Sequence, residues 1–574
     1  MKNNDRKRGK PRQEVDLSRR AFLGNAAALT VAGGLLGAPG VAGAAPKPKP
    51  AKGIDPQAGN RRRTQAFRAR VEAATFNHHL PIPDHPTNGD EDLYPDRIGS
   101  YSKGLPHNSF GEVDMVAYNA FLGACATGLP ADFEAIPMGC PNPAQQMKLV
   151  NPQAGLAFDL EGTDSHQFAM RAAPAFASAE EAGELVENYW MALLRDVAFT
   201  DYGTSPLAQD AADDLSAMSD FRGPKVGGNV TPGTLFREDA PGGLMGPYIS
   251  QLLWRPAPFG AEYVEKRMRT VAAGVDYMTS AADWLDVQNG CMPAGPQFDP
   301  VRRYIRNGRD LSEWVHIDVL FQAYFGAALI LMTPPDATDT VTGGGIGCPP
   351  NPGNPYLGSQ TQIGFGTFGG PYFATILAEV STRALKAVWY QKWFLHRRLR
   401  PEVFAGRIHH KIVNGRGYPI HDDVLNSEAL AEVFSDHGTY FLPMAFPEGS
   451  PLHPAYGAGH ATVAGACVTI LKALFDETFP VANPVVASAD GLSLVPYAGP
   501  DAGSLTVGGE LNKLAANVAN GRNIAGVHWR TDATESLKLG EAVAISILRD
   551  QRACYSESFG GFTFTKFDGT TITV

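Results

Sequence analysis

Residues 453–475 read HPAYGAGHATVAGACVTILKALF, a glycine-rich turn that leads directly into a long apolar run. The apolar positions recur at helical spacing, so a helix is expected over Gly459–Phe475. His460 would then lie in the first turn, beside backbone N–H groups that have no acceptor within the helix. A helix start of this kind favours phosphate-like anions. Cys467 lies on the apolar face and fits core packing better than chemistry.

Helical periodicity dominates the rest of the chain as well. Connections such as Pro334–Gly370 are rich in Gly and Pro and too irregular for alternating strands and helices. The sequence therefore predicts an all-α fold, a large helical bundle with long Gly/Pro-rich loops and minor short β-strands at Phe562–Phe567 and Thr570–Val574. Helices are expected at Val113–Ala126, Ala179–Val197, Ala261–Leu285, Leu311–Leu331, Phe373–Arg400, Gly459–Phe475, Glu510–Asn520 and Glu535–Leu548.

Composition excludes several classes of function. The chain has 574 residues, of which 44% are hydrophobic, and a formal net charge of −10. Nucleic acid is excluded as a partner because its phosphates demand a basic surface. Six cysteines at wide spacing give no zinc or redox motif, and their pairing cannot be read from the sequence. Without internal repeats, residues 66–574 are expected to form one domain, with the informative motifs between residues 390 and 535.

The N-terminal residues have the features of an export signal. SRRAFL (residues 18–23) resembles a twin-arginine motif, an apolar stretch follows over residues 26–41, and the small residues 42–44 suit cleavage. A membrane anchor is the alternative, but the apolar stretch is short and interrupted by Gly and Pro. Residues 1–44 are therefore expected to direct export to the periplasm or the exterior and to leave no anchor after cleavage. Residues 45–65 are interpreted as a flexible leader.

A second segment, YQKWFLHRRLRP (residues 390–401), is strongly basic. On one continuous helix Lys392 and Arg400 would lie within roughly 80° of each other, so both can reach one pocket. The following proline disfavours helical geometry at Arg400, which places that side chain at the end of the helix. A solvated basic face is the alternative, and Arg397 and Arg398 fit that interpretation.

A third segment, NGRNIAGVHWRTD (residues 520–532), places Arg522 before His528 in a glycine-containing loop. The two residues can form an anion clamp. Asp532 lies at helical spacing from His528, where it can hold the imidazole ring and set its tautomer. Taken alone, a histidine in such a setting is more often an ordinary core or surface residue.

The three segments, in this order, resemble the vanadium-dependent haloperoxidases and the acid phosphatase superfamily that shares their anion pocket. The pattern of that family is a Lys and an Arg-Pro, then Ser-Gly-His, then an Arg followed six residues later by a His. Here the pattern reads Lys392, Arg400-Pro401, Ala458-Gly459-His460, Arg522 and His528. The spacing of eight from Lys to Arg is similar to the algal bromoperoxidases. Longer stretches resemble the red-algal type, namely residues 102–108, 311–331 and 441–450, and the resemblance extends from about residue 66 to the last helix.

This resemblance implies a vanadate cofactor and a set of ligands for it. Lys392, Arg400 and Arg522 would neutralise the equatorial oxygens of the vanadate through charge-assisted hydrogen bonds. The Gly459 N–H would add a donor. His528 would be the metal ligand, bound axially to vanadium.

The resemblance also implies the reaction. His460 would contact the apical oxygen and act as acid and base toward hydrogen peroxide, and His453 would modulate protonation or halide use. Vanadium would act as a Lewis acid while a halide, bromide or iodide, is oxidised to hypohalous acid that halogenates small organic acceptors.

Assembly and calcium follow from the resemblance alone. Red-algal relatives form homo-oligomers built on a dimer, up to a dodecamer, often with structural calcium. The Trp314–Leu331 segment fits such an interface, although ordinary core is the alternative. No calcium motif can be matched in Gly364–Phe373, so calcium is left open.

One position departs from the family pattern. The serine of Ser-Gly-His is Ala458 here, which removes one hydroxyl donor to a vanadate oxygen. A hydrogen bond to a charged group is worth about 1.5–3 kcal/mol, so weakened or altered handling of vanadate and peroxide is expected. Two other functions stay open. One is an acid phosphatase with His528 as nucleophile and His460 as the acid for the leaving group. The other is an oxyanion-binding homologue that Ala458 has made catalytically weak.

Overall fold

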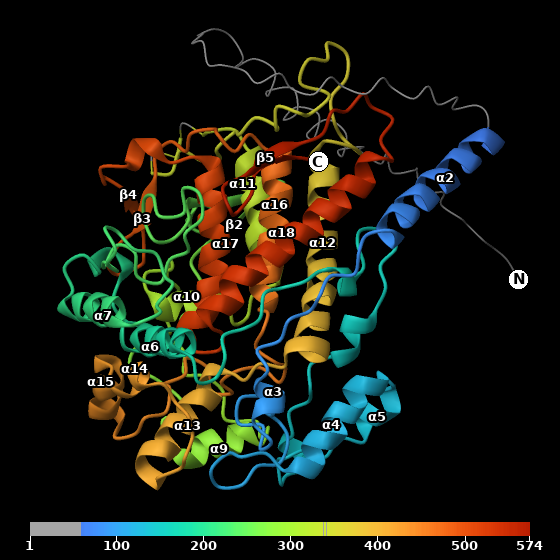
Figure 1. Ribbon diagram of the computed structural model, residues 1–574. Coiled ribbons are helices and arrows are strands. Elements are labelled where there is room, and N and C mark those ends of the chain that lie inside the picture. The colour runs from blue at the N-terminus through green and yellow to red at the C-terminus, as the bar shows by residue number, and fades with distance from the viewer. Residues whose placement is uncertain (1–58, 337, 340) are drawn as a thin grey trace, which may run out of the picture.

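The computed structural model describes residues 59–336, 338–339 and 341–574 (Figure 1). The predicted export signal (residues 1–44) and the leader as far as residue 58 lie outside these residues. The last part of the predicted leader is helical rather than extended, because α2 (Gly59–His78) already begins at Gly59. None of the α2 residues is buried, and the helix extends away from the rest of the molecule (Figure 1).

Four long helices form the centre of the molecule: α12 (Gly370–Tyr390), α16 (Gly459–Leu474), α17 (Val507–Ile524) and α18 (Arg530–Arg552). α16 contacts the other three, and Figure 1 shows the group side by side. Every residue of α16 except His460 is buried. The start of α16 is therefore fixed in space by packing on several sides.

Small residues bring α16 and α18 into close contact. A Cβ atom added to Gly540 on α18 would lie 2.0 Å from the Thr462 carbonyl oxygen, and one added to Gly465 on α16 would lie 2.1 Å from the Leu537 carbonyl oxygen. The two backbones thus approach so closely that neither glycine can carry a side chain without a shift of the helices. Cys467 lies in the same region and is fully buried, as core packing requires.

Shorter helices and loops surround this centre, and the few strands form three separate antiparallel pairs. The all-α prediction is confirmed. The other α-helices are α3 (Asp90–Leu93), α4 (Met115–Thr127), α5 (Pro130–Glu134), α6 (Ala179–Leu193), α7 (Pro206–Ala217), α8 (Gln251–Trp254), α9 (Ala281–Gln288), α10 (Gly308–Trp314), α11 (Gln322–Met332), α13 (Pro401–Asn414), α14 (Asp422–Leu425) and α15 (Glu428–His437). The strands are β1 (Ala257–Phe259), β2 (Glu262–Val264), β3 (Val485–Ala487), β4 (Leu494–Pro496), β5 (Thr563–Thr565) and β6 (Thr571–Thr573).

Most of the predicted elements are present. The helices expected in the regions of α4, α6, α16, α17 and α18 are confirmed within a few residues, as is the strand pair β5–β6 near the C-terminus. α17 extends further than predicted and includes Arg522 in its last turn. The sequence did not indicate α7, α13 or α15.

The helix predicted over Ala261–Leu285 is wrong. The segment begins with the hairpin β1–β2, and residues further on pair with a neighbouring loop through the bridges Met268–Arg303 and Val271–Phe298. A helix, α9, starts only after Ser280, whose side chain accepts a hydrogen bond from the Asp283 N–H. This cap is the first local signal that favours a helix in the segment.

The helix predicted over Leu311–Leu331 is interrupted. α10 ends at Trp314 and α11 begins at Gln322, and the residues between them form a turn in which Ile317 and Val319 are exposed. β-Branched residues lower helix propensity, and three of them alternate along this turn. α11 itself is mostly buried, which supports ordinary core for this part of the predicted interface segment.

The helix predicted over Phe373–Arg400 ends early. After α12 the chain forms a π-helical turn over Gln391–His396, and Arg397 adopts a left-handed conformation with φ 39°. Arg400 is in extended geometry and is the N-cap of α13, which begins with Pro401. Lys392 and Arg400 therefore do not share a helix face. The prediction that they lie close together because of their angular separation on one helix was wrong in its reasoning.

Two further features bear on the earlier expectations. Cys140 and Cys291 form a disulfide, whereas Cys125, Cys348, Cys467 and Cys554 are free. Among the helices of the described residues, none combines the length and the apolar character that a bilayer crossing requires.

Candidate functional site

Three buried cations from distant parts of the chain point to one place near the start of α16. Lys392 lies in the π-helical turn after α12, Arg400 immediately before α13, and Arg522 in the last turn of α17. Their exposed fractions are 0%, 0% and 6%. The π-turn and the kink at Arg397 are what bring Lys392 and Arg400 together, since a straight helix would have carried them apart.

The contacts of these cations are to carbonyl oxygens and to two histidines, His453 and His528. Lys392 Nζ and Arg400 Nη2 each lie 2.8 Å from Nδ1 of His453. Arg400 Nη1 donates to the Val527 carbonyl at 2.6 Å, and its Nε donates to the His453 carbonyl at 3.0 Å. The same nitrogen also lies 3.1 Å from the Pro454 carbonyl oxygen. Burial and the two cations hold the pKa of His453 well below its ordinary value, so the ring is neutral.

Arg522 is the least satisfied of the three. Its Nη1 donates to the Val315 carbonyl at 2.9 Å, but its buried Nε has no hydrogen-bond partner among the described residues. Neither Arg522 nor the other two cations forms an ion pair with a carboxylate within the described part of the chain. Asp318, Glu402 and Asp532 act on these cations only from beyond ion-pair distance. Buried charges in proteins are normally paired, so three cations without a carboxylate in direct contact indicate a site for an anion.

Electrostatics reflect this crowding of positive charge. Burial, followed by repulsion from Arg400, holds the pKa of Lys392 well below its ordinary value, and burial lowers the pKa of Arg522 to about 10. Burial and the neighbouring cations also hold the pKa values of His453 and His528 well below the ordinary value. A bound anion would offset the repulsion among the three cations, because its negative charge favours their protonated forms.

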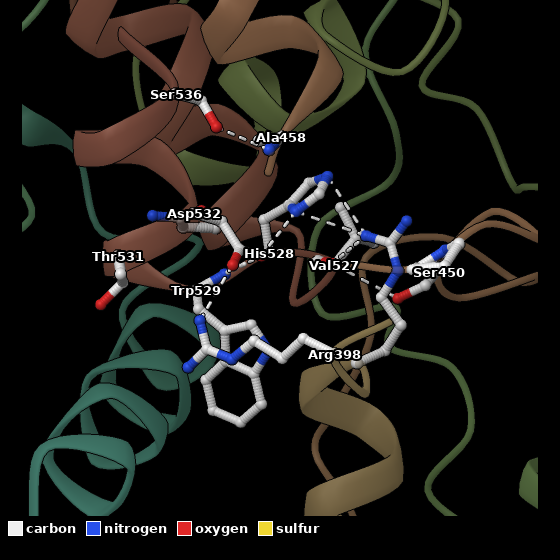
Figure 2. Close-up of polar contacts among 12 residues, drawn as sticks. Arg398, Ser450, Ala458, Val527, His528, Trp529, Thr531, Asp532 and Ser536 are labelled. Atoms are coloured by element: carbon white, nitrogen blue, oxygen red, sulfur yellow. Dashed lines mark hydrogen bonds and ion pairs between the residues drawn. The ribbon is translucent and has the colours of Figure 1, made fainter. Parts of the chain in front are cut away.

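The start of α16 adds backbone donors to the cluster. The first N–H groups of a helix have no acceptor within it, and Gly459 is the first residue of α16. A Cβ on Gly459 would lie 3.0 Å from the ring of Trp389, so a larger residue here would have to displace the indole slightly. Ala458 is the N-cap and offers no side-chain hydrogen bond, while its own N–H donates to Ser536 Oγ at 2.8 Å (Figure 2).

His528 faces the cations with a defined ring orientation. Its Nδ1 lies 2.8 Å from Oδ2 of Asp532, and its Nε2 lies 3.1 Å from Nη1 of Arg400 (Figure 2). Burial raises the pKa of Asp532 to about 6 even though Arg398 opposes the shift. Because the carboxylate accepts the Nδ1 proton, the lone pair of His528 lies on Nε2 and is directed into the site.

His460 is held through its other nitrogen. Nε2 of His460 lies 2.8 Å from Oδ1 of Asp318, in the turn between α10 and α11. Its side chain is 19% exposed, more than any other residue of the cluster, which places it on the solvent side. Since Asp318 takes Nε2, the nitrogen of His460 that can act on a ligand is Nδ1.

A buried network supports Arg400 from behind. Lys103 Nζ donates to Glu402 at 3.1 Å and to the carbonyl oxygens of Glu448 and Ser450 at 2.8 and 2.5 Å. Ser450 Oγ in turn donates to the other oxygen of Glu402 at 2.5 Å. Residues 102–108 and 441–450, which were noted separately in the sequence, thus meet at the first turn of α13, two residues from Arg400.

The interpretation of Arg397 and Arg398 as a solvated basic face was wrong. Arg398 is fully buried and pairs with Glu181 and Glu184. It also pairs with Asp532 (Figure 2). Arg397 is mostly buried and pairs with Glu91. The left-handed conformation at Arg397 turns the chain, so consecutive arginines point into different parts of the protein.

A stacked layer backs Arg522. The guanidinium of Arg522 lies over the ring of Phe446 at 5.3 Å, and the ring of His316 stacks on Phe446 at 3.8 Å. His316 contacts Glu313 and Glu448, at 3.3 and 2.6 Å. Burial alone would lower the pKa of His316, but these two carboxylates raise it to about 9, so His316 is an imidazolium at neutral pH.

The structure thus brings together the residues that the sequence singled out: His453, Ala458, Gly459, His460, Lys392, Arg400, Arg522, His528 and Asp532. Their individual roles stay predictions. The sequence reasoning missed Asp318, Trp389, Arg398 and Lys103. An acid inside the apolar run around Asp318 was a usable signal, whereas nothing local distinguished Arg398 from its basic neighbours.

Comparisons with known proteins agree with this arrangement. A family model described as the VCPO second helical-bundle domain matches residues 373–556. Vanadium-dependent bromoperoxidases of Corallina pilulifera and Corallina officinalis are each 36% identical to the chain, over 89% of it and 98% of their own length. The vanadium-dependent bromoperoxidase of Ascophyllum nodosum is 35% identical, over 90% of the chain and 93% of its own length. The homohexameric structure of a second vanadate-dependent bromoperoxidase from Ascophyllum nodosum matches with a TM-score of 0.83 and 30% identity, and covers 94% of both chains.

The charged state of His316 generates a pH-dependent prediction. Its folded pKa of about 9 lies above the ordinary 6.5, so its contribution to stability is fully present below pH 6.5 and is lost as pH rises through 9. The His316→Gln variant should therefore melt well below the wild type near pH 6 and approach it at about pH 10. Thermal unfolding of both proteins across this range tests the prediction. The Glu448→Gln variant should weaken the same pH dependence, and a constant difference between wild type and His316→Gln would contradict it.

Proposed function

Because the chain belongs to the vanadium-dependent haloperoxidase family, we propose that it holds vanadate among its buried cations and oxidises bromide with hydrogen peroxide. The observation that carries this proposal is the convergence of Lys392, Arg400 and Arg522 without a carboxylate partner among the described residues. Vanadate is a phosphate-shaped oxyanion, and a buried cluster of lysine and arginine donors matches such an anion in charge and in hydrogen bonding.

The residues present fit this cofactor on several counts. The unpartnered Nε of Arg522 is an orphaned donor, and the Gly459 turn lies close against the ring of Trp389. A neutral histidine is a suitable ligand for a metal, and the lowered pKa of His528 keeps its Nε2 deprotonated at neutral pH. Calcium has no such support, since no group of three or more His, Cys, Asp or Glu side chains in the described residues is arranged to hold a metal ion.

Each residue then has a defined task. Lys392, Arg400 and Arg522 bind and orient the anion, and the N-terminus of α16 donates to it through Gly459. His528 presents Nε2 as the ligand, held by Asp532. When bound, vanadate supplies a Lewis acid that polarises peroxide at a fixed oxidation state. Burial of the cations keeps bulk water away from the charged centre.

Proton transfer falls to His460. Its Nδ1 is the free nitrogen, and Asp318 holds the ring from the opposite side. The pKa of His460 is lowered, mainly by burial, although Asp318 opposes the shift. A neutral imidazole at the solvent side of the site can accept a proton from incoming peroxide and return it to the product. His453 is placed differently, because its Nδ1 is occupied by Lys392 and Arg400.

The choice of halide rests on the relatives. The relatives described above are named bromoperoxidases, which supports bromide, and iodide is the alternative to be tested. A phosphatase activity is the second candidate, because Nε2 of His528 faces the cations as a nucleophile for a phosphoester would. A catalytically weak oxyanion-binding protein is the third, because Ala458 contributes no donor.

Assembly into a homo-oligomer is also proposed, with a dimer-based assembly up to a dodecamer as the range to be tested. One relative is a homohexamer, and α2 exposes Phe67 and Val71, at 64% and 44%, on one side of an unburied helix. Light scattering on the protein in solution tests this idea, and a monomer would contradict it.

Export by the twin-arginine route remains a proposal that rests on SRRAFL at residues 18–23. Replacing both arginines by lysine should retain the precursor in the cytoplasm, which cell fractionation would show.

Activity assays separate the three functions. Protein saturated with vanadate should brominate an organic acceptor when peroxide and bromide are present, whereas protein without vanadate is tested for hydrolysis of an aryl phosphate. The Lys392→Met variant should lose vanadate binding. A matched control is Lys386→Met, because Lys386 lies on the preceding helix and pairs with Asp159 near the surface. No bromination at full vanadate occupancy would contradict the proposed function, and hydrolysis without bromination would favour the phosphatase.

Restoring the family serine should strengthen the site. In Ala458→Ser the new hydroxyl can donate to the anion, and a hydrogen bond to a charged group is worth about 1.5–3 kcal/mol, roughly ten- to a hundred-fold in affinity. The same hydroxyl can instead cap α16, which has no side-chain cap, and raise stability by about 1 kcal/mol. Equilibrium titration with vanadate and thermal unfolding measure the two effects separately. Ala458→Gly, which adds no donor, is the control, and unchanged vanadate affinity in Ala458→Ser would refute the missing-donor argument.

A further inference from the structure

Arg398 is a fully buried arginine that has no role in the chemistry proposed above. Its guanidinium pairs with three carboxylates: Glu181, Glu184 at 2.8 Å and Asp532 at 2.9 Å. It also lies over the ring of Trp529, 4.6 Å from the centroid. A buried arginine held from several sides has little freedom to move, so its direction toward Asp532 is fixed by the fold.

The carboxylate of Asp532 is shared between Arg398 and the site. Oδ1 accepts from Nη1 of Arg398, whereas Oδ2 lies 2.8 Å from Nδ1 of His528 and also accepts from the Trp529 N–H at 3.3 Å. Figure 2 shows Asp532 between the two side chains. With one oxygen held by the planar guanidinium, the carboxylate cannot rotate away from His528 without breaking a buried ion pair.

The backbone near Arg398 reinforces this connection. The carbonyl of the next residue, Leu399, accepts from Nε1 of Trp529 at 3.0 Å, and Arg400 donates to the Val527 carbonyl at 2.6 Å. Three consecutive residues thus hold the chain on both sides of His528. The Arg398 carbonyl also accepts from the Ala455 N–H at 3.1 Å, in the turn that leads to α16.

We propose that Arg398 is a positioning residue for the oxyanion site: it fixes Asp532, and through Asp532 it sets the orientation and tautomer of His528. Arg398 does not touch the anion. Its effect is to keep the proton of His528 on Nδ1 and Nε2 directed toward the cations. This inference rests on the proposed oxyanion site but not on any particular reaction there.

Lysine is the informative replacement. It keeps the positive charge among the three carboxylates, but its ammonium is a compact point charge without the planar fork of guanidinium. Arg398→Lys therefore tests the hold on Asp532 rather than the presence of charge. Changes to residues that hold a ligand from behind typically cost about 10–100-fold in metal affinity, and we expect a loss of about that size for orthovanadate and for inorganic phosphate.

A double-mutant cycle distinguishes positioning from a structural role. Dissociation constants for both anions are measured by equilibrium titration for the wild type, Arg398→Lys, Asp532→Asn and the double variant. If Arg398 acts through Asp532, the double variant should bind no more weakly than Asp532→Asn alone. Losses that multiply, or an Arg398→Lys affinity within about three-fold of wild type, would overturn the proposal. The limit of about three-fold is below the smallest loss expected when a residue that holds a ligand from behind is changed.

Two controls keep the result interpretable. Arg397→Lys changes the neighbouring arginine, which pairs with Glu91 away from the site, and should leave anion binding unchanged. If Arg398→Lys lowers the melting temperature, nitrogen NMR of histidine-labelled protein still reports which ring nitrogen of His528 carries the proton, with His528→Gln used for assignment. An unchanged tautomer in folded Arg398→Lys would also count against the proposal. The phosphate measurements stand even if the wild type shows no bromination, so the two failures can be told apart.

Discussion

The rest of this structure depends on the burial of three positive charges beside one another. Two like charges 4–6 Å apart repel by about 3–4 kcal/mol at an effective dielectric constant of about 20, before any cost of desolvation. The protein offsets part of this with the carbonyl oxygens of Val315, His453 and Val527, which are dipoles rather than charges. The repulsion that these carbonyl groups leave uncompensated favours the binding of an oxyanion. A carboxylate at this position would stabilise the anion-free protein, and it would weaken the binding of an anion for the same reason.

Such a cluster can exist only where the surroundings hold it rigidly. Its members come from the turn after α12, the residue before α13 and the last turn of α17, and α16 packs against both α12 and α17. Around them lies a shell of paired charges, with Arg398 among three carboxylates and Lys103 on Glu402. The ion pairs therefore surround the site and the unpaired cations occupy its centre. This division explains how one region carries so many buried charges and still presents net positive charge to a ligand.

Sequence reasoning located the main helices because they rest on local patterns. It located the site because three such segments together resemble the pattern of a known family. Apolar spacing defines α16, and an arginine, a histidine and an acid at fixed intervals define the segment around His528. The reasoning failed where geometry departs from a regular helix. The π-turn at Lys392 and the left-handed Arg397 give no clear local signal, so a single helix to Arg400 was predicted. Asp318 and Arg398 were missed for a related reason, since their importance comes from partners more than 100 residues away.

The two central histidines show how the fold assigns different tasks to identical side chains. Asp532 takes Nδ1 of His528, which leaves Nε2 as the nitrogen with a free lone pair. Asp318 takes Nε2 of His460, which leaves Nδ1 instead. His528 is deep among the cations, where a neutral ligand is favoured, whereas His460 is partly open to solvent, where a proton can be exchanged. The carboxylate that holds each ring thus determines which nitrogen faces the site. The burial of the histidine determines whether that nitrogen binds the anion or transfers a proton. Since neither carboxylate touches the anion, the division of labour is set by residues outside the pocket itself.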